Sequence, residues 1–153
     1  MKKNSTTHPF LESLPSEHLK TLQEVSMYAQ FEPGEVIFRE GEPADRFYLI
    51  HTGEVELEAD RENDSLVSIQ KLHAGEVLGW SWLYPPYVWH FHARATRRTT
   101  ATVYDGAKLR AQCDKNPAFG YEVMKRISQL VVERLQTTRD HLFHHTPKTK
   151  DPG

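Results

Sequence analysis

Aromatic side chains gather in one short stretch of the chain, residues 75–95, whose sequence is GEVLGWSWLYPPYVWHFHARA. Six of them stand within positions 80–91, although aromatics make up 10% of the whole chain, and all three tryptophans (Trp80, Trp82 and Trp89) are among them. Rings in this number can stack on the flat face of a nucleotide base, or can fill the core of a small β domain. The sequence leaves both roles open.

Two histidines in the same stretch, His90 and His92, alternate along the chain, so a strand would present both imidazoles on one face, as a metal site requires. This pattern suggests a metal enzyme of the cupin class, but the further Glu and His ligands that such a site needs are absent. A pair of polar side chains on the wet face of a strand is the simpler interpretation. Three more histidines have helical metal-binding spacing, but at a polar helix end: His141, His144 and His145.

The composition excludes several classes of protein. The chain has 153 residues, enough for one domain with its own core, and 19 basic side chains balance 21 acidic ones. That balance argues against a bulk attraction to nucleic acid. No apolar run approaches a membrane span, and no signal-peptide core follows the N-terminus, so we expect a cytoplasmic protein without membrane contact. The lone Cys113 excludes an internal disulfide and a four-thiolate metal site.

Short alternating segments separated by turns predict the elements that position this stretch. Gly-Glu-Val occurs at Gly34, Gly53 and Gly75, where each glycine ends a turn before a strand and is expected to have a positive φ. Such punctuation is typical of a closed or double-layered antiparallel β fold. Strands are predicted at residues 27–31, 36–39, 46–51, 55–59, 65–72 and 99–104, after a frayed terminus (residues 1–8) and a short helix from residue 15.

The C-terminal third is predicted to be helical. A short helix runs through Cys113, and a long one from about 117 to 144 has an apolar stripe that either lies along the barrel or pairs with a second copy. We expect a homodimer through Val123, Ile127, Leu130 and Val131. The fold class is therefore mainly β with flanking helices: an antiparallel β-roll of the jelly-roll type plus a long C-terminal helix. One domain is predicted over residues 1–145, and a disordered tail over 146–153.

This order of elements resembles the cyclic nucleotide-binding domain of the catabolite-activator family of bacterial regulators. The resemblance rests on spaced glycines: Phe31-x-Pro33-Gly34-Glu35, Arg39-Glu40-Gly41-Glu42, Tyr48-x-Ile50-x-x-Gly53-x-Val55 and Leu72-x-x-Gly75-Glu76-x-x-Gly79. It implies an eight-stranded β-roll with the long helix as the usual dimer element. The family's transcription factors continue into a helix-turn-helix domain, whereas this chain ends within about ten residues of its long helix, so we expect no direct DNA binding.

The resemblance also implies where a ligand would bind. Family members hold a cyclic nucleotide in a cassette that begins Gly-Glu and ends with Arg, Ser or Thr, and Ala; the Glu binds the ribose and the Arg the cyclic phosphate. Here the cassette glycine is Gly79, which Trp80 follows, and the cassette ends at Trp89-His90-Phe91. Both diagnostic ligands are missing, so the cassette is degenerate unless Glu76 binds the ribose in a shifted register. Arg94 could supply a replacement charge.

These observations give candidate ligand-binding residues in the cassette: Gly79, Trp80, Ser81, Trp82, Trp89, His90 and Arg94. Among them Trp82 is expected to pack under the cassette in the core, and Trp89 to stand at the mouth of the pocket, where its replacement would leave the domain folded. No catalytic residue and no metal site are predicted, and a nucleotide is the only cofactor considered.

The predicted function is a non-enzymatic regulatory or accessory protein that binds a partner protein or a non-standard nucleotide-like ligand through its aromatic cassette. Three alternatives stay open at this point: a true cyclic-nucleotide sensor with shifted ligands, an accessory subunit of an NAD-coupled redox enzyme, and a cupin-like metal enzyme. For the predicted regulatory or accessory protein, we expect a homodimer and also a protein partner. A redox enzyme is one candidate for that partner.

Overall fold

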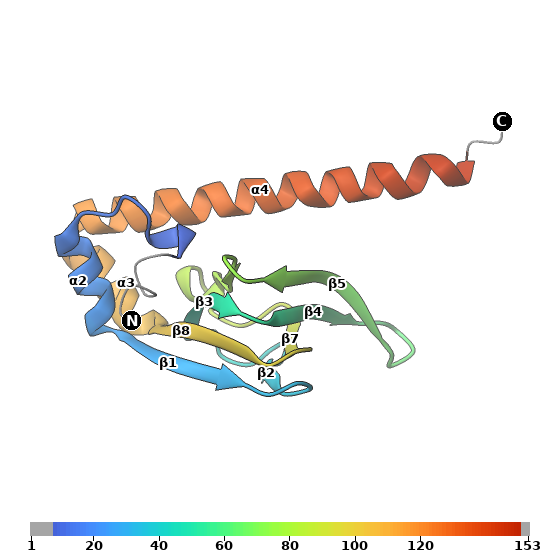
Figure 1. Cartoon of the computed structure of the whole chain (residues 1–153), viewed down its shortest axis with the longest axis horizontal. Coiled ribbons are helices and arrows are strands. Elements are labelled where there is room, and N and C mark those ends of the chain that lie inside the picture. Colours follow the sequence, from blue (N-terminus) through green and yellow to red (C-terminus); the bar gives the residue numbers. More distant parts are fainter. Residues whose placement is uncertain (1–7, 151–153) are drawn as a thin grey trace.

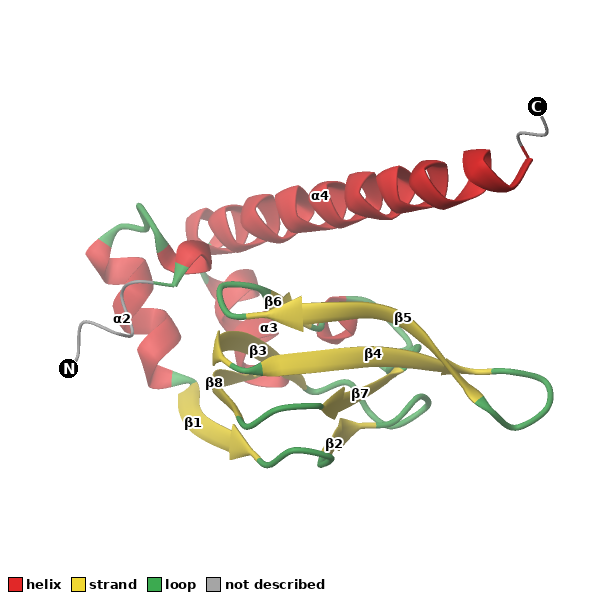
Figure 2. Cartoon of the chain, turned by 45° about the vertical axis from the view of Figure 1, so that its right-hand side comes forward, coloured by secondary structure: helices red, strands yellow, loops and turns green. Residues whose placement is uncertain are grey.

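The structure, a computed structural model, describes residues 8–150, with the side chains of residues 141 and 144–150 left aside. Eight strands form two antiparallel four-stranded sheets that face one another as a β-roll, as the sequence predicted (Figures 1 and 2). One sheet has the order β1-β8-β3-β6 and the other β2-β7-β4-β5. The strands are β1 (Ser26–Phe31), β2 (Val36–Phe38), β3 (Arg46–Thr52), β4 (Glu54–Asp60), β5 (Leu66–His73), β6 (Val77–Leu78), β7 (His92–Ala95) and β8 (Thr99–Asp105).

Helices cover the outside of the first sheet. The helical elements are η1 (Pro9–Leu11), α2 (Ser16–Glu24), η2 (Ser81–Leu83), α3 (Gly106–Lys115) and α4 (Pro117–Lys150). Asp105 caps α3, since its carboxylate accepts a hydrogen bond from the Lys108 amide at 3.0 Å. Helix α4 begins beside α2 and α3 and runs along the roll (Figures 1 and 2). It continues to Lys150, beyond the predicted end near residue 144, and residues 151–153 of the predicted tail lie outside the described residues.

Strand β3 explains why the domain has two cores. Its side chains alternate between the two faces of the sheet, yet Phe47, Tyr48, Leu49 and Ile50 are all buried. Tyr48 and Ile50 pack inside the roll, whereas Phe47 and Leu49 pack on the outside, under the helices. A strand that is covered on both faces reads as a continuous apolar run, which is what residues 47–50 are.

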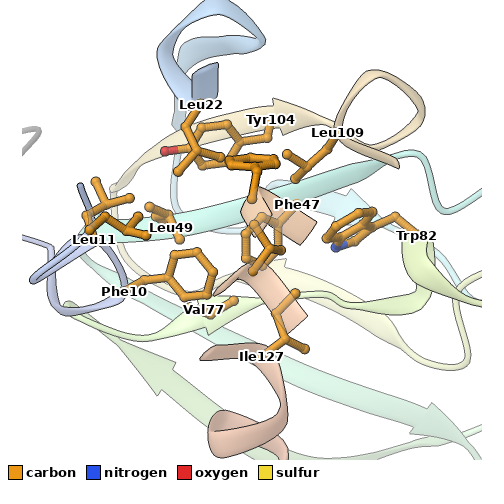
Figure 3. Packing of buried hydrophobic residues seen from close by; sticks show 13 residues of the cluster. Phe10, Leu11, Leu22, Phe47, Leu49, Val77, Trp82, Tyr104, Leu109 and Ile127 are labelled. Atoms are coloured by element: carbon orange, nitrogen blue, oxygen red, sulfur yellow. The ribbon is translucent and has the colours of Figure 1, made fainter. Parts of the chain in front are cut away.

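The outer core joins the first sheet to the helices (Figure 3). Phe10 of η1 and Leu22 of α2 meet Phe47, Tyr104 and Leu109 there, and Ile127 of α4 closes the cluster. The inner core lies between the sheets and is built from Phe38, Ala44, Tyr48, Ile50, Val55, Leu57, Leu72, Leu78, Trp89, Ala93, Ala101 and Val103.

The turn glycines behave as predicted, and Gly53 shows why. All three Gly-Glu-Val glycines have positive φ, and for Gly53 the value is 104°. A Cβ atom at this position would also collide with the Thr99 side chain and the Arg98 carbonyl. Only glycine satisfies both constraints in this tight β3–β4 turn.

A frayed terminus was predicted over residues 1–8, and the structure corrects this prediction for His8. His8 is buried; its Nδ1 accepts a hydrogen bond from the Phe10 amide at 3.1 Å, and its Nε2 lies 3.2 Å from the Glu76 carbonyl oxygen. Burial lowers the pKa of His8 to about 4. The neutral imidazole therefore connects η1 to the turn before β6. Nothing in the hydrophobic periodicity of the sequence indicates this role. Residues 1–7 lie outside the described part of the chain.

Candidate functional site

The aromatic stretch forms a connection between β6 and β7 that folds back over the edge of the roll. Gly79 follows β6 with a φ of 90°, and one turn of 3-10 helix, η2, comes next. The chain then passes through Tyr87, which also has positive φ, and reaches β7 at His92. Val88 forms an isolated bridge to Pro43, which holds the returning segment against the roll. Sequence periodicity did not predict β6, which has only two residues, and gave no bounds for β7, although a strand was considered at His90 and His92.

Trp89 lies inside the roll and not at a pocket mouth, which corrects the prediction for this residue. Its side chain is 2% exposed and stacks on Phe38, with ring centroids 3.8 Å apart and planes 7° from parallel. The far edge of the indole also presses on Gly79, where an added Cβ would lie 2.6 Å from a ring atom. The ring therefore occupies the space in front of the cassette glycine. In the family, this position holds a charged residue that binds the phosphate and stays near the surface. The prediction for Trp89 assumed the same location for an uncharged indole.

Trp82 is fully buried, as predicted, but in the outer core (Figure 3). Its ring lies 5.5 Å from that of Phe47, and its Cβ approaches the position that a side chain on Gly106 would need. Its carbonyl accepts a hydrogen bond from the Arg110 guanidinium, which also lies 4.2 Å from the centre of the Tyr87 ring. Trp82 and Arg110 thus fasten the cassette to α3, and Trp82 has no face left for a ligand.

Trp80, the residue after the cassette glycine, points to α4. The Arg134 guanidinium lies 4.6 Å from the centre of the Trp80 ring and donates a hydrogen bond to the Val77 carbonyl at 2.9 Å. Burial lowers the pKa of Arg134 from its ordinary value, while Glu76 opposes that shift. This contact joins the start of the cassette to the long helix, and no sequence pattern pointed to Arg134.

The other predicted ligand residues do not converge on one point. Arg94 lies on the outer face of the second sheet, where it pairs with Glu58 at 2.6 Å and with Glu56 at 3.5 Å. Glu58 is the first cause of the raised pKa of Arg94. Ser81 is half-buried at the start of η2, and His90 is exposed. Arg94 is already neutralised and faces away from the roll interior, so it does not replace the charge of a phosphate-binding arginine.

The sequence itself matches a known family over this region. Residues 28–116, more than half of the chain, match the family described as "Cyclic nucleotide-binding domain". The chain belongs to this family. The family match, the two four-stranded sheets and the flanking helices agree with the resemblance found in the sequence.

Solved structures repeat this cyclic nucleotide-binding fold. A protein of Geobacter metallireducens named as cyclic nucleotide-binding is 30% identical, with a TM-score of 0.77, and the match covers 88% of this chain and 96% of that one. A cyclic nucleotide-binding domain from Methylobacillus flagellatus is 22% identical, with a TM-score of 0.79 over 94% of this chain and 81% of that one. The Thermus thermophilus catabolite activator protein is 21% identical, with a TM-score of 0.69 over 88% of this chain and 61% of that one. The last two likenesses concern the fold alone.

A curated relative places a similar domain within a larger protein. A Rhodopseudomonas palustris protein named as a potassium channel protein is 30% identical over 126 residues, which are 82% of this chain and 29% of the relative. The chain thus spans less than a third of that relative's length. None of the helices described over residues 8–150 has both the length and the apolarity that a bilayer crossing needs.

The histidines of this cyclic nucleotide-binding domain do not form the metal site considered from the sequence. His90 and His92 do not act together: the one group of possible metal ligands found among the described residues is Glu40, Asp60 and His92. Within it, His92 Nδ1 accepts a hydrogen bond from the Glu40 amide at 3.1 Å, so Nε2 carries the proton and donates it to Asp60 at 3.0 Å. Both ring nitrogens therefore have a hydrogen-bond partner, and a metal would have to replace one of these two bonds. The side chains of residues 141, 144 and 145 lie outside the described ones.

Helix α4 presents two apolar faces, and the domain itself uses the first. Val123 and Ile127, two of the predicted dimer residues, are 1% exposed and belong to the outer core, and Leu130 packs against it. The prediction is corrected for Val123 and Ile127, which are not free to meet a second copy because the roll and its helices cover them, whereas Leu130 is only half-buried. Arg126 supports this attachment by donating to the Phe10 carbonyl at 2.9 Å.

The second face of α4 is uncovered in the monomer. Val131, Leu135 and Leu142 are 36%, 67% and 58% exposed, and their spacing of four and seven residues is that of a coiled-coil seam. Leu135 lies about 80° around the helix from Ile127. Of the predicted dimer residues, only Val131 lies on this face.

Proposed function

We propose that this protein is a non-enzymatic regulatory or accessory protein whose cassette is degenerate and which acts through a protein partner in the cytoplasm without responding to cyclic nucleotides. The observation that carries the proposal is the position of Trp89: its indole packs between Gly79 and Phe38, inside the roll. The cyclic nucleotide-binding fold is usually non-catalytic, and the cassette offers neither the ribose carboxylate nor the phosphate guanidinium.

The burial of the tryptophans disfavours a stacked nucleotide-like ligand and favours a protein partner. A base needs an open ring face, but Trp82 and Trp89 are buried, and Arg134 lies over Trp80. The cassette does present other groups outward: Tyr84, at the end of η2, is 52% exposed, and His90 is exposed beyond it. An exposed tyrosine beside polar neighbours is a typical anchor in protein interfaces.

The homodimer is proposed through the second face of α4, defined by Val131, Leu135 and Leu142. Pairing this face with its copy would remove three large apolar side chains per chain from water, each worth about 1.5–3 kcal/mol when fully buried. This seam uses α4 without disturbing the Val123 and Ile127 contacts of the outer core.

The experiment that tests the function is native purification of the tagged protein with mass spectrometry of the intact complexes. We expect a stoichiometric partner protein and no nucleotide adduct. Tyr84→Ser should abolish partner binding, whereas Tyr121→Ser, which removes a tyrosine of at least equal exposure from α4, should leave it intact. A stoichiometric mass increase equal to a cyclic nucleotide would contradict the proposal, and so would equal effects of the two substitutions.

A further inference from the structure

A cavity of about 350 Å³ lies outside the cassette, on the outer face of the first sheet. Helix α2 and the segment before it form one wall, and strands β1 and β8 form the other. Among the residues that the structure describes, its lining contains no charged side chain and is mainly apolar: Leu11, Leu19, Leu22, Gln23, Ser26, Met27, Tyr28, Thr102 and Tyr104. Met27 and Tyr28 are exposed, so the cavity opens to solvent between the end of α2 and the edge strand. Its volume falls at the lower end of the range of about 300–1,000 Å³ found for small-molecule sites.

Tyr104 supplies an unused hydrogen-bonding group to this cavity. The residue as a whole is 3% exposed and its hydroxyl has no hydrogen-bond partner among residues 8–150, but the oxygen atom is not one of the enclosed unpartnered atoms and is therefore open to the cavity. In Figure 3 the phenol oxygen points to the side of the cluster where Leu11 and Leu22 lie, and both of these line the cavity. An accessible phenol on the wall of a mainly apolar cavity is therefore available to a group from outside the chain, in place of water.

Two other hydroxyls of the wall are already in use, and that of Tyr28 belongs to a side chain that is 66% exposed to water. Thr102 Oγ1 lies 2.6 Å from His51 Nε2, and the Ser26 hydroxyl donates to the Gln23 carbonyl at 2.9 Å. Burial raises the pKa of Tyr104, so the phenol keeps its proton and acts as a donor. A protonated phenol can donate and accept, but it is the stronger donor, so the group that matches it best is an acceptor. A charged ligand would meet no opposite charge here and would lose its hydration, so the ligand must also be neutral.

We propose that this cavity binds a small, neutral, mainly apolar molecule with one hydrogen-bond acceptor, which the Tyr104 hydroxyl orients. A single aromatic ring or a short branched chain bearing a carbonyl has the required size and chemistry. The site is separate from the cassette, because Tyr104 belongs to the outer core and Trp89 to the inner core. This proposal is independent of the function assigned above.

The test compares two probes of nearly identical shape. Acetophenone has a carbonyl oxygen where α-methylstyrene has a methylene group, so the pair isolates the hydrogen bond. In an amide-detected NMR titration of the full chain, we expect saturable shifts at residues 26–28 and 102–104 with both probes. Acetophenone should bind about fivefold more tightly, which is the factor expected for one neutral hydrogen bond.

Two matched variants locate the effect. Tyr104→Phe removes only the hydroxyl and should equalise the affinities of the two probes. Tyr48→Phe removes a hydroxyl from an equally buried tyrosine inside the roll and should leave the fivefold preference intact. The proposal is wrong if neither probe gives saturable shifts at these residues up to about 10 mM. Equal binding of both probes to the unaltered protein, or a preference that survives Tyr104→Phe, also overturns it.

Discussion

Replacing Trp89 by alanine tests whether its indole is part of the core. The side chain is 2% exposed and stacked on Phe38, so the substitution removes a full set of buried contacts and leaves a cavity beside Gly79. A buried tryptophan covers about 150–250 Å², which corresponds to roughly 4–6 kcal/mol at 25 cal/mol per Å². Measured losses for such substitutions are about 3–5 kcal/mol, because neighbouring atoms relax. We therefore expect Trp89→Ala to lower the free energy of unfolding by about 4 kcal/mol.

Urea denaturation followed by far-ultraviolet circular dichroism is the assay, since its signal does not depend on tryptophan. Trp80→Ala is the matched control: Trp80 is half-buried and rests under Arg134, so its removal should cost less than half as much. Trp89→Phe keeps a ring on Phe38 and should recover most of the loss. The reasoning is refuted if Trp89→Ala costs less than about 1 kcal/mol, the size of an ordinary surface substitution.

Three further outcomes follow from the same contacts. Leu135→Asp should turn the proposed dimer into a monomer in sedimentation without lowering the melting temperature of the monomer. Ile127→Asp, in contrast, should unfold the domain. An unchanged dimer with Leu135→Asp would exclude this seam. The pKa of His8 is about 4 in the folded state and 6.5 when unperturbed, so the unfolded chain takes up the proton first and the free energy of unfolding should fall as pH drops from 6.5 towards 4. His8→Gln should flatten this pH dependence in urea titrations. An unaltered pH dependence would contradict the role of His8. Arg134→Met should remove the hydrogen bond to the Val77 carbonyl and lower protection of the cassette amides in hydrogen exchange, and unchanged protection would argue against this link to α4.

Much of the fold could be predicted from the sequence because its strands alternate clearly and its turns carry glycines. The strand at 55–59, where apolar residues alternate with glutamates, and the turn at Gly53 are examples, since their patterns depend on local geometry alone. The two-residue β6 could not be predicted, because it has no period to detect and exists through pairing with β3.

The site was harder to predict because side-chain direction depends on contacts distant in the sequence. Trp80 and Trp89 have the same residue type in one stretch, yet Trp80 turns outward to Arg134 and Trp89 inward to Phe38. The stripe of α4 likewise divides into covered and uncovered faces only once the roll is in place. The sequence pattern places Tyr104 at the end of a strand, and nothing in the neighbouring residues indicates a cavity.

Isothermal titration calorimetry of the unaltered protein with cyclic AMP and cyclic GMP shows whether the cassette binds a cyclic nucleotide. With the Trp89 indole packed against Gly79 and no guanidinium inside the cassette, we expect no binding tighter than about 100 μM, or roughly −5.5 kcal/mol. Circular dichroism of the same sample should show that the protein is folded. A stoichiometric isotherm in the micromolar range with either nucleotide would contradict the claim, since the indole would then have to leave the roll.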